Sequence, residues 1–72
     1  MNNAANPARG YHLDYSKHNG FVITHEDGEG NGESYGFGAY NDAAEAVAVL
    51  NTLAARGRPT YISRRARREG AR

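Results

Sequence analysis

The sequence predicts an α+β domain in which an antiparallel sheet of three strands carries one α-helix across its inner face. Three observations predict this fold. Two short strand-like segments flank an Asn-Gly pair, a third segment alternates aromatic residues with glycine, and a later stretch has the apolar periodicity of a helix. The 72 residues suffice for one small domain. The chain has no cysteine, so we expect no disulfides and a reducing compartment.

The first two strands are expected at residues 11–15 and 21–25, joined by a turn at residues 18–20. A two-residue loop would place Tyr15 on the same face as Thr24. A three-residue loop with Gly20 left-handed pairs Lys17 with Phe21 and Tyr15 with Ile23, and it gathers the large apolar residues on one face. We favour that loop, because a one-residue slip would turn a whole strand's side chains over. The outer face then carries His12, Asp14, Ser16, Val22, Thr24 and Glu26.

An acidic, glycine-rich stretch at residues 26–33 predicts a mobile loop. Residues 27–32 match the first half of an EF-hand loop, but the twelfth position, which requires a bidentate Glu, is Gly38. We therefore expect no metal there. A third strand should follow, with Tyr35, Phe37 and Ala39 facing inward and Tyr40 facing the opposite way. An aromatic platform for nucleic-acid bases is the alternative for these tyrosines, but a small domain needs most of its aromatic residues in the core.

The helix is expected at residues 42–56. Asp42 is a good N-cap with Glu45 three residues later, Gly57 suits the C-terminal end, and Pro59 prevents continuation. Residues 60–62 would add a short fourth strand at an edge. The predicted core consists of Tyr11, Leu13, Tyr15, Phe21, Ile23, Phe37, Ala46, Val47, Leu50 and Leu53.

These elements divide the chain into a disordered N-terminus at residues 1–9, one α+β domain at 10–62 and a basic C-terminal tail at 63–72. The tail has no large apolar residue, so we expect it to be solvated, or helical only when bound. No apolar run approaches the length of a membrane span. An exposed edge strand could pair two copies into a homodimer.

The net charge of +1 conceals a strong asymmetry along the chain. Residues 1–55 carry seven acidic and two basic side chains, a net charge of −5, whereas residues 56–72 carry seven arginines and one glutamate, a net charge of +6. An acidic body with a basic end is typical of proteins that bind charged partners. The candidate acidic surface comprises Asp14, Glu26, Asp27, Glu29 and Glu33. The candidate basic surface comprises Arg56, Arg58, Arg64, Arg65, Arg67 and Arg68.

No constellation of residues predicts an enzyme. His12 points outward, His25 inward and His18 lies in the turn, so the three histidines do not converge on a metal or a nucleophile. So small a sheet with one helix encloses little volume for a substrate. We therefore expect a non-enzymatic binding protein without catalytic residues, metal or cofactor.

Two resemblances accompany these features. Three antiparallel strands followed by a helix resemble the DNA-binding domains of AP2 proteins and of phage integrases, in which basic strand residues contact DNA; here the outer face offers His12, Asp14, Thr24 and Glu26 instead. In size, layout and charge pattern the chain also resembles phage-encoded anti-CRISPR proteins. That resemblance implies a protein of the bacterial host-cell cytoplasm that inhibits a host nucleoprotein (CRISPR surveillance) complex. The acidic surface of the inhibitor would occupy a nucleic-acid site of that complex.

The alternative function is a small nucleic-acid-binding accessory protein that uses the arginines of residues 63–72. The same arginines would also suit a solvated terminus that only improves solubility.

Overall fold

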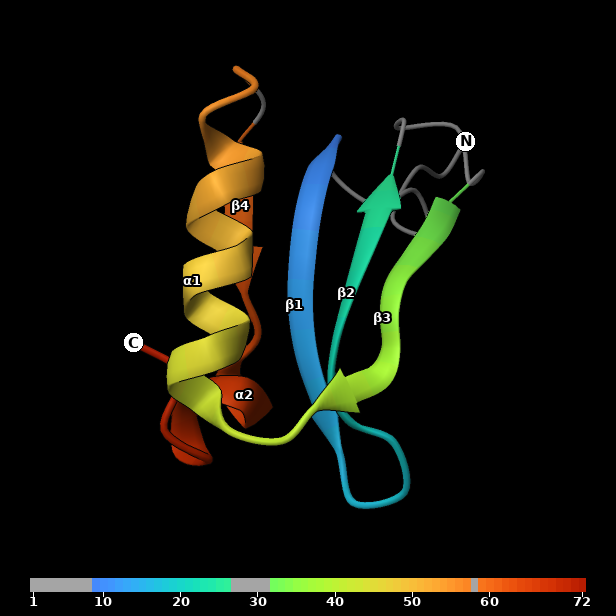
Figure 1. Ribbon diagram of the computed structural model, residues 1–72, viewed down its shortest axis with the longest axis vertical. Coiled ribbons are helices and arrows are strands. Elements are labelled where there is room, and N and C mark those ends of the chain that lie inside the picture. The colour runs from blue at the N-terminus through green and yellow to red at the C-terminus, as the bar shows by residue number, and fades with distance from the viewer. Residues whose placement is uncertain (1–8, 27–31, 58) are drawn as a thin grey trace, which may run out of the picture.

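The computed structural model describes residues 9–26, 32–57 and 59–72, with the backbone alone described for residues 32–39. Of the predicted disordered N-terminus at residues 1–9, residues 1–8 lie outside this range. The predicted loop at residues 26–33 is too long at both ends, because Glu26 belongs to a strand and Gly32 begins the next one, and residues 27–31 lie outside the described range. The described elements, in chain order, are β1 (Gly10–Ser16), β2 (Gly20–Glu26), β3 (Gly32–Tyr40), α1 (Ala43–Ala54), β4 (Thr60–Ile62) and α2 (Arg64–Arg68) (Figure 1). The α+β class is as predicted.

The sheet has the strand order β3-β2-β1-β4, and it is mixed. The pairs β1/β2 and β2/β3 are antiparallel, but β4 pairs with β1 in parallel. The prediction of a purely antiparallel sheet is therefore wrong at this edge. The reason is the return path through α1: a strand that follows such a crossover runs in the direction of β3, which is also the direction of β1.

The β1/β2 hairpin has the predicted faces but not the predicted register. Tyr15 pairs with Phe21 rather than with Ile23, and the loop comprises residues 17–19. Gly20 adopts a φ of 76°, the left-handed conformation expected of it. Because the register differs by two residues, every side chain keeps its face, so Leu13 and Ile23 are fully buried as predicted.

The β2/β3 pairing contains an irregularity that turns Tyr40 inward. Ile23 pairs with Tyr35, whereas Phe21 pairs with Tyr40, so β2 advances two residues while β3 advances five. Such an uneven step reverses the alternation of faces. Tyr40 is half-buried and packs against the core, which corrects the prediction that it faces away.

Helix α1 covers the inner face of the sheet. Oδ1 of its N-cap residue, Asp42, accepts a hydrogen bond from the Glu45 N–H at 2.8 Å, as predicted. The helix ends at Ala54, before the predicted residue 56, and Gly57 follows with a φ of 93°. The buried hydrophobic residues among those described are Tyr11, Leu13, Phe21, Ile23, Ala46, Leu50, Leu53, Ala66 and Ala71, while Tyr15 and Val47 are partly buried. The Phe37 side chain lies outside the described part.

Residues 63–72 differ most from expectation, because they fold against the domain instead of forming a solvated tail. Ala66 and Ala71 are each 0% exposed. After α2, Gly70 has a φ of 111°, the Ala71 N–H donates to the Ala66 carbonyl at 3.0 Å, and the Gly70 N–H donates to the Arg67 carbonyl. These two hydrogen bonds around a left-handed glycine define the Schellman motif, which ends a helix and brings two apolar residues on either side of that end together. The segment is therefore helical without a partner.

Candidate functional site

Helix α2 is fixed to the sheet by Ser63. The Ser63 hydroxyl accepts a hydrogen bond from the Ala66 N–H at 3.0 Å, which caps the helix, and donates one to Oδ1 of Asp14 at 2.7 Å. The Ser63 N–H also donates to the Leu13 carbonyl at 2.9 Å. The bonds made by the Ala66 and Ser63 N–H groups satisfy two donors that the N-terminal end of the short helix would otherwise leave open. Together they hold α2 at a set position relative to β1.

Burial of Ala66 decides where the arginines of α2 lie. Residues three and four apart are neighbours on a helix surface, so Arg64, Arg67 and Arg68 share the side that faces away from Ala66. All three are exposed. Arg64 and Arg67, together with Ile62, line a shallow hollow of about 320 Å³. We call Arg64, Arg67 and Arg68 the arginine cluster.

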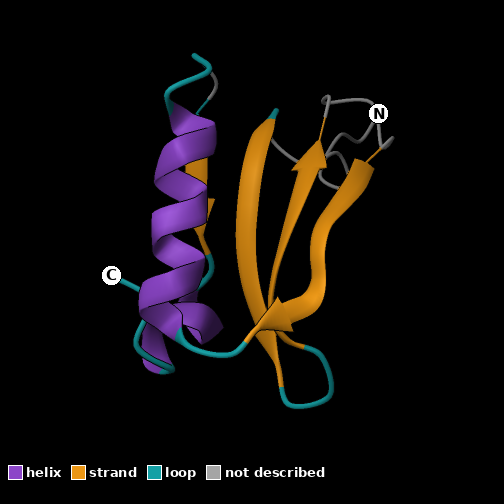
Figure 2. Cartoon of the chain, viewed as in Figure 1, coloured by secondary structure: helices purple, strands orange, loops and turns teal. Residues whose placement is uncertain are grey.

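The remaining arginines of the predicted basic surface do not join this cluster. Arg65 is turned toward the sheet, where Nη1 donates to the Tyr15 carbonyl at 3.4 Å. Arg56 follows the C-terminal end of α1. Helix α2 lies beside the N-terminal end of α1 instead (Figures 1 and 2), and Gly70, which follows α2, approaches Ala43 there. Arg58 lies outside the described residues. The predicted set is therefore split between the two ends of α1.

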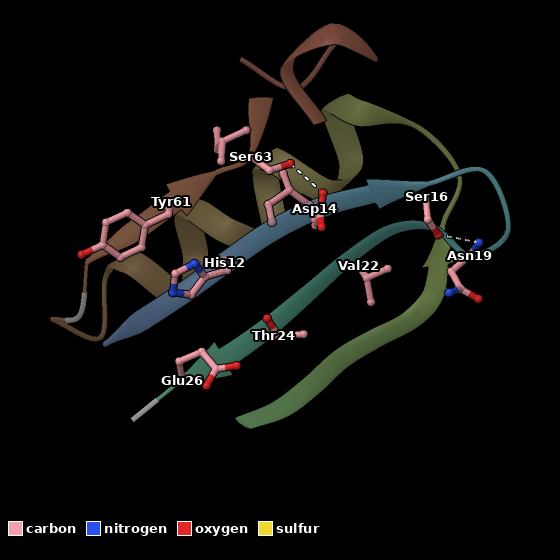
Figure 3. Close-up of a pocket in the computed structure, with 11 residues that line it drawn as sticks. His12, Asp14, Ser16, Asn19, Val22, Thr24, Glu26, Tyr61 and Ser63 are labelled. Carbon is pink, nitrogen blue, oxygen red and sulfur yellow. Dashed lines mark hydrogen bonds between the residues drawn. The ribbon is translucent and has the colours of Figure 1, made fainter. Parts of the chain in front are cut away.

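The outer face of the sheet carries a second candidate surface. Figure 3 shows this face, with α1 behind the sheet. An open concavity of about 500 Å³ lies over β1, β2 and β4. The six residues predicted for the outer face all line it, as do Tyr61 and Ser63. We call it the outer concavity.

The predicted acidic surface is only partly present on this face. Asp14 and Glu26 line the outer concavity. Asp27 and Glu29 lie outside the described residues. The backbone of Glu33 pairs in register with His25 of β2, and the Glu33 side chain lies outside the described part.

Sequence reasoning missed the contribution of Tyr61 to the outer face. Tyr61 pairs with His12 across the parallel β1/β4 contact, and the two rings stack with centroids 4.7 Å apart and planes inclined by 21°. Tyr61 remains 40% exposed. The signal was the alternation of residues 60–62, but it becomes useful only once β4 is known to lie beside β1.

The histidines occupy the predicted faces and do not converge. His12 lines the outer concavity, and His25 packs against Tyr11 on the inner side. Among the described residues, no three His, Asp or Glu side chains form a group that could hold a metal ion.

No helix in residues 9–26, 32–57 and 59–72 has the length and apolar character to cross a bilayer. Comparisons with protein-family models, curated proteins and solved structures found no match to this chain.

Proposed function

We propose that this protein binds nucleic acid, and that the arginine cluster of α2 contacts the phosphates. The observation that carries this proposal is the anchoring of α2: Ala66 and Ala71 are fully buried, and Ser63 is bonded to β1. A fixed cluster of guanidinium groups loses less conformational freedom on binding than arginines of a flexible tail would lose. Arginine also matches the geometry of phosphate through paired N–H donors.

The test measures binding of fluorescently labelled duplex DNA and single-stranded RNA by anisotropy, over a series of salt concentrations. For the intact protein we expect affinity to fall steeply as salt rises, because bound cations are released from the phosphates. Replacing Arg64, Arg67 and Arg68 together by Gln should reduce the slope of log affinity against log salt by about 2 to 3. Gln is close to Arg in helix propensity, so the fold should be retained, as circular dichroism would show.

Arg56→Gln is the matched control, because it removes the same charge from an exposed residue at the other end of α1. It should change the slope far less than Arg67→Gln alone. Equal effects of the two single substitutions, or no binding by the intact protein at low salt, would refute the proposal.

A second proposal concerns the outer concavity, where Asp14 and Glu26 both lie. We propose that this face is the part of the chain that could act as an anti-CRISPR-like inhibitor, by engaging Lys or Arg residues with which a host nucleoprotein complex holds nucleic acid. Complementary charge favours fast and specific association. Pull-down with CRISPR surveillance complexes, followed by competition with their target DNA, tests this role, and no association would exclude it.

A further inference from the structure

We propose that the outer concavity is a binding site for an arginine side chain of a partner protein. This inference is independent of the phosphate contacts proposed for α2. It would supply the inhibitor proposal with its contact chemistry, but it holds for any partner that presents an exposed arginine. The argument rests on the charge, the aromatic wall and the unpartnered oxygen of the concavity.

The charge of the concavity is of one sign. Its formally charged lining residues are Asp14 and Glu26, and neither Lys nor Arg is among the residues that line it. Its other lining groups include the Thr24 and Ser16 hydroxyls and the apolar side chains of Val22 and Ile62. A cationic group on an apolar stem therefore fits the surface better than an anion or a fully apolar segment does.

One oxygen of the Glu26 carboxylate lacks a hydrogen-bond donor. This oxygen, Oε1, is buried and has no hydrogen-bond partner within the described part of the chain. A buried carboxylate oxygen without a donor is costly, and a charged N–H donor from a ligand would relieve that cost once the Glu26 side chain turns this oxygen toward the concavity. Asp14 differs, because its Oδ1 already accepts bonds from the Ser63 hydroxyl and the Tyr15 N–H, each at 2.7 Å. Glu26 is therefore the residue that a ligand would engage first.

The aromatic wall favours arginine over lysine. His12 and Tyr61 stack on each other, His12 pairs with Thr24 in the neighbouring strand, and Glu26 follows two residues later on the same face (Figure 3). A planar guanidinium stacks on aromatic rings while its edge donates two N–H groups to a carboxylate. The stacked rings of His12 and Tyr61 and the carboxylate of Glu26 lie at one end of the concavity, so they provide both contacts. A compact ammonium would use the carboxylate but not the flat wall.

The test is an NMR titration of the ¹⁵N-labelled protein with the peptide acetyl-Gly-Arg-Gly-Arg-Gly-amide. We expect shift changes at His12, Thr24, Glu26 and Tyr61. The same peptide with citrulline in place of arginine, which is similar in shape but uncharged, should leave these signals unmoved. Substituting lysine for arginine should weaken binding, and Tyr61→Ala should remove most of the difference between the two peptides.

Glu26→Gln should weaken binding of the arginine peptide about tenfold, the usual effect of losing a hydrogen bond to a charged group. Glu45→Gln is the matched control, since it removes the same charge from an exposed residue on α1, and it should change affinity by less than about twofold. The inference is overturned by equal effects of the two variants, by binding of the citrulline peptide, or by shifts confined to other surfaces. If the NMR signals of the concavity and α2 shift with protein concentration in the absence of peptide, the occupant of the concavity is a second copy of the chain. That result would also overturn the inference.

The outcome is separable from that of the nucleic-acid proposal. Glu26 belongs to the sheet's outer face, not to the arginine cluster, so Glu26→Gln should not weaken nucleic-acid binding. Loss of peptide binding in Glu26→Gln with retained salt-dependent DNA binding would support both proposals. A protein that binds DNA but not the peptide would refute this inference alone.

Discussion

At the scale of the residue, Gly10 sets how closely β4 can approach β1. Gly10 has a φ of 139°, and a Cβ added there would collide with the Pro59 carbonyl oxygen. That oxygen accepts a hydrogen bond from the Tyr11 N–H at 3.0 Å, the contact that begins the β1/β4 pairing. Glycine is therefore required at this position by both the backbone conformation and the close approach.

We expect Gly10→Ala to lower the free energy of unfolding by at least about 2 kcal/mol, measured by urea denaturation. Gly57→Ala is the control, because Gly57 also has a positive φ, 93°, but nothing lies within 4 Å of its added Cβ. It should cost only about 1 kcal/mol, for the conformation alone. A loss at Gly10 no larger than that at Gly57 would mean that β4 does not pack as described.

Ser63 links β1 to α2 through a single hydroxyl group. We expect Ser63→Ala to lower the free energy of unfolding by about 1–2 kcal/mol, because both the helix cap and the bond to Asp14 are lost. Thr52→Ala serves for comparison: it removes a hydroxyl that donates to the Ala48 carbonyl on the exposed side of α1. Thr52→Ala should change the free energy of unfolding by no more than about 0.5 kcal/mol. The two substitutions would have similar effects if α2 were not capped by Ser63.

At the scale of the element, α2 depends on burial of Ala66, which is 0% exposed. We expect Ala66→Asp to destabilise the protein by more than about 3 kcal/mol, since it would bury an unpaired charge. Ala48→Asp makes the same change at an exposed position of α1 and should cost under about 1 kcal/mol. Chemical denaturation of the two variants compares them directly, and similar stabilities would show that Ala66 is solvated.

The elements also show which features a sequence can predict. The faces of β1 and β2, the cap at Asp42 and most of the core follow from apolar periodicity and local hydrogen bonding, which the sequence contains. The inward turn of Tyr40 depends on an uneven step between paired strands, which alternation within one strand cannot reveal. The parallel position of β4 depends on the path of α1, which is a tertiary property.

The fold of α2 was missed for a different reason. The segment has no large apolar residue, which predicts a solvated tail, yet Ala66 and Ala71 are both fully buried. Local signals for the helix were present, namely Ser63 at the N-cap and Gly70 at the C-terminal end. With a helix of five residues, only the contacts to the sheet make those signals decisive.

At the scale of the whole molecule, charges of opposite sign lie on two surfaces of a single folded unit. The arginine cluster projects from α2, while Asp14 and Glu26 lie in the outer concavity. Asp14 touches both regions, because it lines the concavity and also accepts the hydrogen bond from Ser63. The two candidate surfaces are therefore held by one scaffold, and each can be altered with the other left intact.

The account depends most on the claim that the arginine-rich C-terminus is a folded part of the domain. Amide hydrogen exchange of the free protein, followed by NMR at low salt, tests it most directly. We predict slowed exchange for the Arg67 and Ala71 amides, which donate to the Ser63 and Ala66 carbonyls at 3.0 Å each, and helical chemical shifts for residues 64–68. Exchange at the unstructured rate throughout residues 63–72, with random-coil shifts, would contradict the account.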